Sequence, residues 1–132
     1  MAIEQNNHAR QSVLIVAEPA LMRSMLHDLL QRAFPTLTLR QTINGRRALE
    51  LCALHRPQLV LMATDLPDAG SIELTALLKA WYPEIKVIIV SAPDDDFPVE
   101  QAHAAGAIAW ITQDMIHQEL LPRVASALGL AP

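Results

Sequence analysis

The 132-residue sequence is poor in cysteine, which cross-links chains, and in glycine, which shapes phosphate-binding loops: it has one cysteine and four glycines. Aromatic residues are also few, at 4%. The lone Cys52 excludes an internal disulfide, which is usual in a reducing compartment, and we expect it to be a small buried helix residue. No Gly-x-Gly-x-x-Gly or Walker-type loop occurs. The nucleotide-binding classes that depend on such loops are therefore not indicated.

Positive charge is also scarce, with 10 Lys and Arg residues against 14 Asp and Glu and a net charge of -4. Direct nucleic-acid binding would need a basic face, so we predict none. No apolar run approaches the roughly 20 residues that span a bilayer, and residues 1–11 lack the apolar stretch of a signal peptide. We predict a cytoplasmic protein without membrane association, in which a flexible segment at 1–11 precedes one domain at 12–130.

The sequence is 52% hydrophobic, and much of this content lies in short apolar runs. Runs that do not alternate polar with apolar residues predict strands covered on both faces, as in a parallel sheet. Four runs are of this kind: 13–16, 59–62, 87–90 and 108–111. A weaker, alternating run at 37–40 predicts an edge strand.

Helical patterns lie between these runs, at 21–32, 46–55, 72–81, 99–105 and about 119–128. Pro35, Pro57 and Pro83 each follow the end of a pattern, where proline is common. Pro122 lies deep in the last pattern and predicts a helix that starts late or kinks there. The alternation of strands and helices predicts an α/β fold, a doubly wound five-stranded parallel sheet with helices on both faces.

Segment 57–74 resembles the central strand and following loop of the receiver domains of two-component response regulators. In that family an apolar strand ends in an aspartate that accepts a phosphoryl group, shortly before a Leu-Pro or Met-Pro turn. The turn here is Leu66-Pro67, and the resemblance places Ala63 at the phosphoacceptor position. It extends over about 13–128, is nearest to receivers of helix-turn-helix regulators, and implies the flavodoxin-like (βα)5 receiver fold.

The resemblance also implies that the magnesium site is degraded. The family has two adjacent acids at the end of the first strand, where this sequence has Ala17 and Glu18. Magnesium needs several oxygen ligands in octahedral geometry, so Glu18 and Asp65 are weak candidates. An exposed acid beside a helix start is the simpler interpretation of Glu18. We therefore predict no metal and no cofactor; Asp65 as a displaced phosphoacceptor remains an alternative.

The fourth and fifth strands end in further positions of the family's switch. Ser91 stands where a Ser or Thr hydroxyl moves toward the phosphoryl group, although it is more simply satisfied by a local backbone group. Trp110 stands at the aromatic switch position, with core packing as the alternative. Gln113 replaces the family's lysine, and a neutral amide cannot serve as counter-ion to a phosphoryl group.

We accordingly expect a pseudo-receiver that is not an enzyme and acts by protein–protein contact. Two alternatives stay open: a receiver that responds to phosphate or another anion through Asp65 or an unusual site, and a small-ligand or enzymatic domain on the same fold. The expected contact, with a protein partner or in a homodimer, uses the fourth helix, fifth strand and fifth helix. Its candidate residues are Phe97, Val99, Ala102, Ala105, Trp110 and Ile116.

Overall fold

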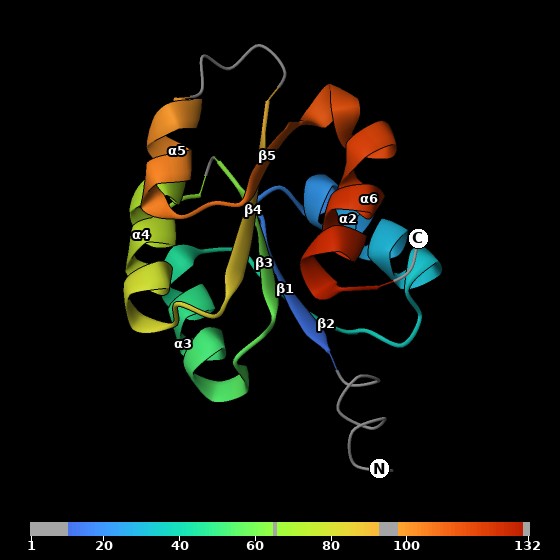
Figure 1. Cartoon of the computed structure of the whole chain (residues 1–132), viewed down its shortest axis with the longest axis horizontal. Helices are drawn as coiled ribbons and strands as arrows, with labels where there is room; N and C mark the ends of the chain where they lie inside the picture. Colours follow the sequence, from blue (N-terminus) through green and yellow to red (C-terminus); the bar gives the residue numbers. More distant parts are fainter. Residues whose placement is uncertain (1–10, 65, 93–97, 131–132) are drawn as a thin grey trace.

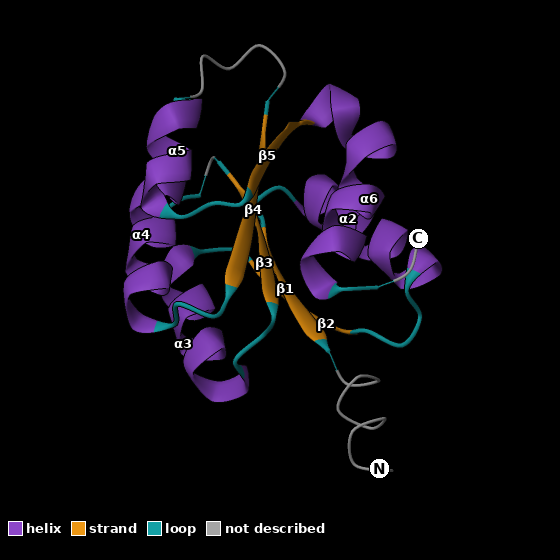
Figure 2. Cartoon of the chain, in the orientation of Figure 1, coloured by secondary structure: helices purple, strands orange, loops and turns teal. Residues whose placement is uncertain are grey.

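The computed structural model describes residues 11–64, 66–92 and 98–130. Asp65, Phe97 and nearly all of the segment 1–11 therefore lie outside the described residues. The described chain forms one five-stranded sheet between two layers of helices (Figures 1 and 2). The expected flexibility of segment 1–11 stays a prediction.

All the strands pair in parallel, in the order β2-β1-β3-β4-β5. Their bounds are β1 (Ser12–Val16), β2 (Thr38–Thr42), β3 (Leu59–Ala63), β4 (Lys86–Ser91) and β5 (Ala109–Thr112). This is the flavodoxin-like order, in which ligands bind outside the carboxyl ends of the strands. The predicted fold class is confirmed, and β2 is an edge strand, as its alternating pattern indicates.

The helices of the described chain flank the sheet as the pattern of the sequence predicts. Figure 1 shows α3, α4 and α5 on one face of the sheet and α2 and α6 on the other. Their bounds are α2 (Ala20–Ala33), α3 (Gly45–His55), α4 (Ser71–Trp81), α5 (Val99–Ala105) and α6 (Ile116–Leu128), the last preceded by the 3-10 turn η1 (Gln113–Met115). None of these helices is long and apolar enough to cross a membrane.

The central strands are buried on both faces, and alternate residues enter opposite layers. Val13 and Ile15 of β1 pack into the cluster beneath α2 and α6, whereas Leu14 and Val16 pack into the cluster beneath α3, α4 and α5. This explains why the strand sequence is continuously apolar. Cys52 is fully buried on α3, and burial raises the pKa of its thiol to about 11, which confirms the structural interpretation of this residue.

Of the two predictions based on prolines, one is confirmed and one is wrong. Pro35, Pro57 and Pro83 directly follow the residues that terminate α2, α3 and α4. The last helix, however, begins at Ile116 and contains Pro122, so the expected start near Glu119 is wrong. Burial of apolar side chains in the first turn explains the earlier start, because Ile116 is 1% exposed.

Candidate functional site

The carboxyl edge of the sheet brings three of the predicted positions together. Ala63 is the last residue of β3 and pairs with Val90, and Ser91 follows at the end of β4. Ala17 directly follows β1 at the same edge, and its amide donates a hydrogen bond to the carbonyl of Thr42 at 3.1 Å. Ala17, Ala63 and Ser91 are buried, with exposed fractions of 0, 6 and 0%.

The side chains at two of these positions are continuous with the hydrophobic core. The methyl groups of Ala17 and Ala63 belong to the cluster that also contains Met22, Ile111 and Ile116. A methyl group offers neither a nucleophilic oxygen nor a lone pair for a metal ion. The two positions can therefore pack, but they cannot accept a phosphoryl group or coordinate a cation.

An arginine donates hydrogen bonds to the backbone carbonyl oxygens of the loop that follows β1. Nη1 of Arg23, in the first turns of α2, donates hydrogen bonds to the carbonyl oxygens of Ala17 at 2.8 Å and Glu18 at 3.1 Å. The side chain of Glu18 is exposed next to the start of α2, as expected. The sequence analysis missed Arg23, because its position in a helical pattern does not reveal that its guanidinium folds back over the preceding loop.

The described donors do not fit the magnesium ion that the family resemblance implies. Glu18 offers one exposed carboxylate, and its neighbour Ala17 offers none. Asp65, the other weak candidate, lies outside the described residues. Within the described ranges no three His, Cys, Asp or Glu side chains are grouped so that they could hold a metal ion. Octahedral coordination of Mg²⁺ would have to come almost entirely from water and backbone.

Ser91 and Trp110 are joined by a hydrogen bond across the last two strands. Nε1 of the Trp110 indole donates to Oγ of Ser91 at 3.0 Å, and the hydroxyl is fully buried. The expectation that a local backbone group satisfies Ser91 is therefore wrong. The partly buried indole combines packing with a specific polar contact, a combination that tryptophan favours.

Gln113 is exposed, in contrast to this buried group. It lies in η1, immediately after β5, and carries a neutral amide. The structure thus brings Ala17, Ala63 and Ser91 to one edge, whereas Glu18 and Gln113 lie at its solvent-exposed margin.

A second residue that the sequence analysis missed positions the loop after Ala63. The Asp68 carboxylate accepts hydrogen bonds from the backbone amides of Gly45 at 2.8 Å and Arg46 at 3.0 Å. These two bonds, to Gly45 first and then to Arg46, hold the pKa of Asp68 below its usual value of 3.8. Asp68 therefore ties the loop between β3 and α4 to the amino end of α3, a contact between segments distant in sequence.

Comparison with known proteins supports the fold and its family. Residues 13–125 match the response regulator receiver domain. The chain is 33% identical over 118 residues to the chemotaxis protein CheY of Thermotoga maritima, covering 89% of this chain and 93% of that protein. It is 31% identical over 122 residues to the polar-differentiation response regulator DivK of Brucella anthropi, covering 90% of this chain and 97% of that protein.

Other relatives are longer than this chain. It is 26% identical over 121 residues to the transcriptional regulatory protein DegU of Brevibacillus brevis, covering 92% of this chain but 51% of DegU. The chain thus spans about half the length of that regulator, and about half of the regulator KdpE of Mycobacterium tuberculosis.

Solved structures agree with this comparison. The signal receiver domain of an HD domain-containing protein from Pseudomonas fluorescens Pf-5 superposes with a TM-score of 0.82 at 26% identity, covering 91% of this chain and 95% of that one. A LuxR-family response regulator from Aurantimonas sp. SI85-9A1 superposes with a TM-score of 0.81 at 22% identity, covering 89% and 84%, which supports the fold alone. Together with the match over residues 13–125, these findings show that the chain belongs to the response regulator receiver domain family of two-component systems.

Proposed function

We propose that this receiver domain, spanning residues 12–130, signals in the cytoplasm by protein contact and without phosphorylation. The observation that carries the proposal is Ala63, a buried methyl group at the end of β3 where the family resemblance requires the phosphoacceptor. Ala17 beside it and the exposed, neutral Gln113 remove a metal ligand and the counter-ion as well. Receiver domains are signalling modules, and we propose no catalytic activity for this one.

The bond between Ser91 and Trp110 supports a domain held in one signalling state. It engages the Ser91 hydroxyl with β5 and keeps the indole partly buried. A receiver switches when a ligand or modification binds one conformation better than another. Without a group that accepts the modification, the preference for one conformation has to come from permanent contacts such as this bond.

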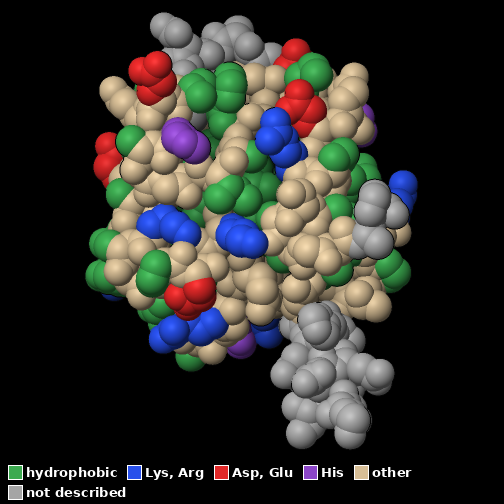
Figure 3. All heavy atoms as spheres, viewed as in Figure 1, with side chains coloured by type: hydrophobic (Ala, Val, Ile, Leu, Met, Phe, Trp, Pro, Cys, Tyr) green, Lys and Arg blue, Asp and Glu red, His purple; other side chains and the backbone are tan. Residues whose placement is uncertain are grey.

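The proposed contact surface is formed by α5, β5 and α6, which Figure 3 shows from the β5 side. Val99 is 38% and Ile108 44% exposed, Trp110 is partly exposed, and all three line one cleft. Two residues expected at this surface belong instead to the core, since Ala102 and Ile116 are each 1% exposed. A mixture of aromatic, aliphatic and charged groups suits a protein partner or a second copy of the chain.

Incubation with a small acyl phosphate and measurement of the intact mass tests the proposal. We expect no gain of phosphoryl mass, because Ala63 has no oxygen that could attack phosphorus. The matched comparison is the Ala63→Asp variant, which introduces a carboxylate oxygen at this position. A stable gain of one phosphoryl group by the unaltered chain, abolished in Asp65→Asn, would overturn the proposal and identify Asp65 as a displaced acceptor.

A further inference from the structure

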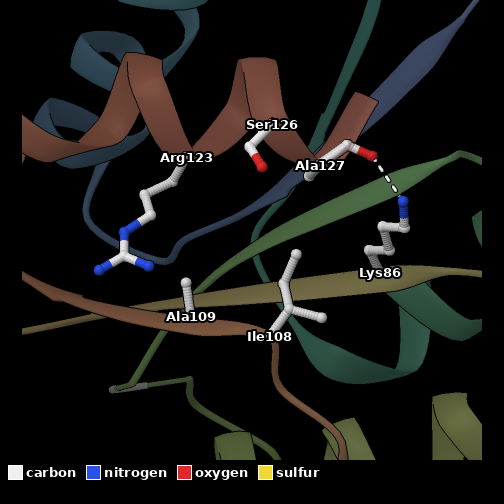
Figure 4. A pocket seen from close by; sticks show the side chains of 6 residues that line it. All are labelled: Lys86, Ile108, Ala109, Arg123, Ser126 and Ala127. Carbon is white, nitrogen blue, oxygen red and sulfur yellow. Dashed lines mark hydrogen bonds between the residues drawn. The ribbon is translucent and has the colours of Figure 1, made fainter. Parts of the chain in front are cut away.

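Side chains that are distant in sequence hold the ends of two helices. At the carboxyl end of α6, Nζ of Lys86 donates a hydrogen bond to the carbonyl oxygen of Ala127 at 2.7 Å (Figure 4). At the amino end of α3, the Asp68 carboxylate accepts from two backbone amides, the first of which belongs to Gly45. This second contact adjoins Asn44, and an asparagine followed by glycine is chemically labile.

The pair Asn44-Gly45 can deamidate without an enzyme. The backbone nitrogen of Gly45 loses its proton and attacks Cγ of Asn44, and Nδ2 takes up a proton and leaves as ammonia. Water then opens the resulting five-membered succinimide to an aspartyl or an isoaspartyl residue. Asparagine is among the thermolabile residues, and a following glycine has no side chain that restricts the backbone or hinders the attack.

The fold requires both residues of this labile pair. Asn44 caps α3, since its Oδ1 accepts a hydrogen bond from the amide of Arg47 at 2.8 Å. Gly45 is buried, and a Cβ at this position would lie 3.1 Å from Cβ of Ala69 in the loop between β3 and α4. Capping of the helix and close approach of the loop therefore explain why asparagine and glycine occur together here.

Two hydrogen bonds oppose closure of the succinimide ring in the folded chain. Closure requires rotation about the Cα–C bond of Asn44, which is extended with a ψ of 167°. This rotation breaks the bond from the amide of Ala48 to the carbonyl of Asn44, at 3.2 Å. It also turns the amide of Gly45 away from Asp68, which it contacts at 2.8 Å. The reaction therefore needs local opening of the first turn of α3.

The charge of Asp68 opposes the first step of the reaction. Hydrogen bonds from Gly45 and Arg46 hold the pKa of Asp68 below its usual value of 3.8, so this side chain is ionised at neutral pH. A negative charge 2.8 Å from the Gly45 nitrogen disfavours loss of the proton from that nitrogen. A carboxylate with so low a pKa is too weak a base to remove this proton itself. The contact with Asp68 thus protects the pair.

We propose that Asn44 is a site of spontaneous deamidation and that the contact of Asp68 with the amino end of α3 controls its rate. The pair is protected while Asp68 holds Gly45, and it reacts when the loop between β3 and α4 leaves the helix. The product has a new carboxylate at the helix end that Asp68 occupies, and the isoaspartyl form lengthens the main chain there by a methylene group. Both changes weaken the attachment of the loop, so the reaction makes its release permanent.

Peptide mass spectrometry of the full chain during incubation at mildly alkaline pH measures the reaction. A synthetic peptide of residues 41–48 gives the rate without the fold. We expect Asn44 to react at least about tenfold more slowly in the folded chain than in the peptide, because ring closure needs local opening. Asp68→Ala should accelerate the reaction in the full chain by about fivefold or more, because two hydrogen bonds to a charged group are lost. Asp68→Asn, which keeps one acceptor oxygen, should have an intermediate rate.

Two control variants separate local opening from general loss of stability. Lys86→Met removes the corresponding contact at the end of α6 and should leave the rate at Asn44 unchanged. Ile88→Val on β4 removes a fully buried methylene group, which destabilises the whole fold, and should also leave this rate unchanged. Acceleration in Ile88→Val equal to that in Asp68→Ala would show that the reaction follows global unfolding, which contradicts the proposal.

The direction of the effect of Asp68→Ala distinguishes protection from catalysis. A slower reaction in this variant would identify Asp68 as a base and overturn the proposal. An unchanged rate would show that the contact does not control the reaction, and equal rates in the unaltered chain and the peptide would show that the fold gives no protection. Each of these results leaves the assignment of Ala63 intact, because phosphorylation is a separate reaction with its own mass change.

Discussion

Asp68 illustrates how one side chain can position a loop of the site. The first amides of a helix have no partner within the helix, and side-chain oxygens often satisfy them. In α3 the Asn44 side chain accepts from the amide of Arg47 at 2.8 Å, while Asp68 accepts from Gly45 and Arg46. The negative charge of Asp68 also complements the amino end of the helix dipole. The loop that follows β3 is thereby attached to α3.

We predict that Asp68→Asn lowers the melting temperature at neutral pH by several degrees, because an amide provides one oxygen and no charge for the two amides. The pKa of Asp68 is lower in the folded chain than its usual 3.8, so its contribution is present above pH 3.8 and is lost as pH falls further. Thermal unfolding between neutral and acid pH should therefore show the variant and the unaltered chain converging in acid. Glu100→Gln on α5, an exposed carboxylate, provides the control; an equal effect there would contradict the assignment.

The contacts that the sequence analysis missed share one physical property. Asp68 acts on residues 22 and 23 positions away, and Trp110 on Ser91 across 19 positions. Arg23 folds back over a loop that its helical pattern does not describe. Composition and periodicity report on local preference and burial, whereas these contacts depend on the tertiary arrangement. The positions at the strand ends could be predicted because the resemblance and the strand pattern agree in register.

At the level of elements, the buried strands were predicted best because their apolar runs reflect burial on both faces. β5 is the exception, since it begins at Ala109 and the predicted run begins at Ile108. Ile108 is 44% exposed at the edge, so its apolar character does not report burial. The last helix was mispredicted for a related reason. Leu120 and the other buried residues of α6 stabilise the helix across Pro122 despite the local preference of proline.

Pro122 gives a prediction for α6. It has no amide hydrogen to bond the carbonyl of Gln118 one turn earlier, and an interior proline costs up to about 3 kcal/mol relative to alanine. We expect Pro122→Ala to raise the free energy of unfolding by about 1–2 kcal/mol, a gain reduced by the added freedom of the unfolded chain.

Urea unfolding measures this change, with Pro35→Ala as the matched control. Pro35 follows the end of α2 and is exposed, so its replacement removes no obstacle within a helix. The control should lose roughly 0.4–1 kcal/mol through the unfolded state. The two substitutions are therefore expected to have opposite signs, and a loss of stability in Pro122→Ala would show that the helix is adapted to the proline.

At the scale of the whole molecule, the fold retains the carboxyl edge of the sheet on which receivers assemble their site. Part of that edge is occupied by apolar side chains of the hydrophobic core. Ala17 and Ala63 extend the cluster beneath α2 and α6 to the end of the sheet. Acidic side chains at these positions would place two carboxylates in a buried environment, and like charges in such a site need a cation. The alanines remove that repulsion together with the metal site.

This arrangement predicts that magnesium leaves the stability of the domain almost unchanged. We expect the domain to bind Mg²⁺ with a dissociation constant above about 10 mM. Addition of about 10 mM Mg²⁺ then raises the free energy of unfolding by less than about 0.4 kcal/mol, which shifts the melting temperature by less than about 2 °C. Thermal unfolding at constant ionic strength measures this. The variant Ala17→Asp with Ala63→Asp should melt lower without metal and recover with Mg²⁺, whereas each single substitution should recover less. A saturable stabilisation of the unaltered chain at submillimolar Mg²⁺, lost in Glu18→Gln, would show instead that Glu18 anchors a functional metal site.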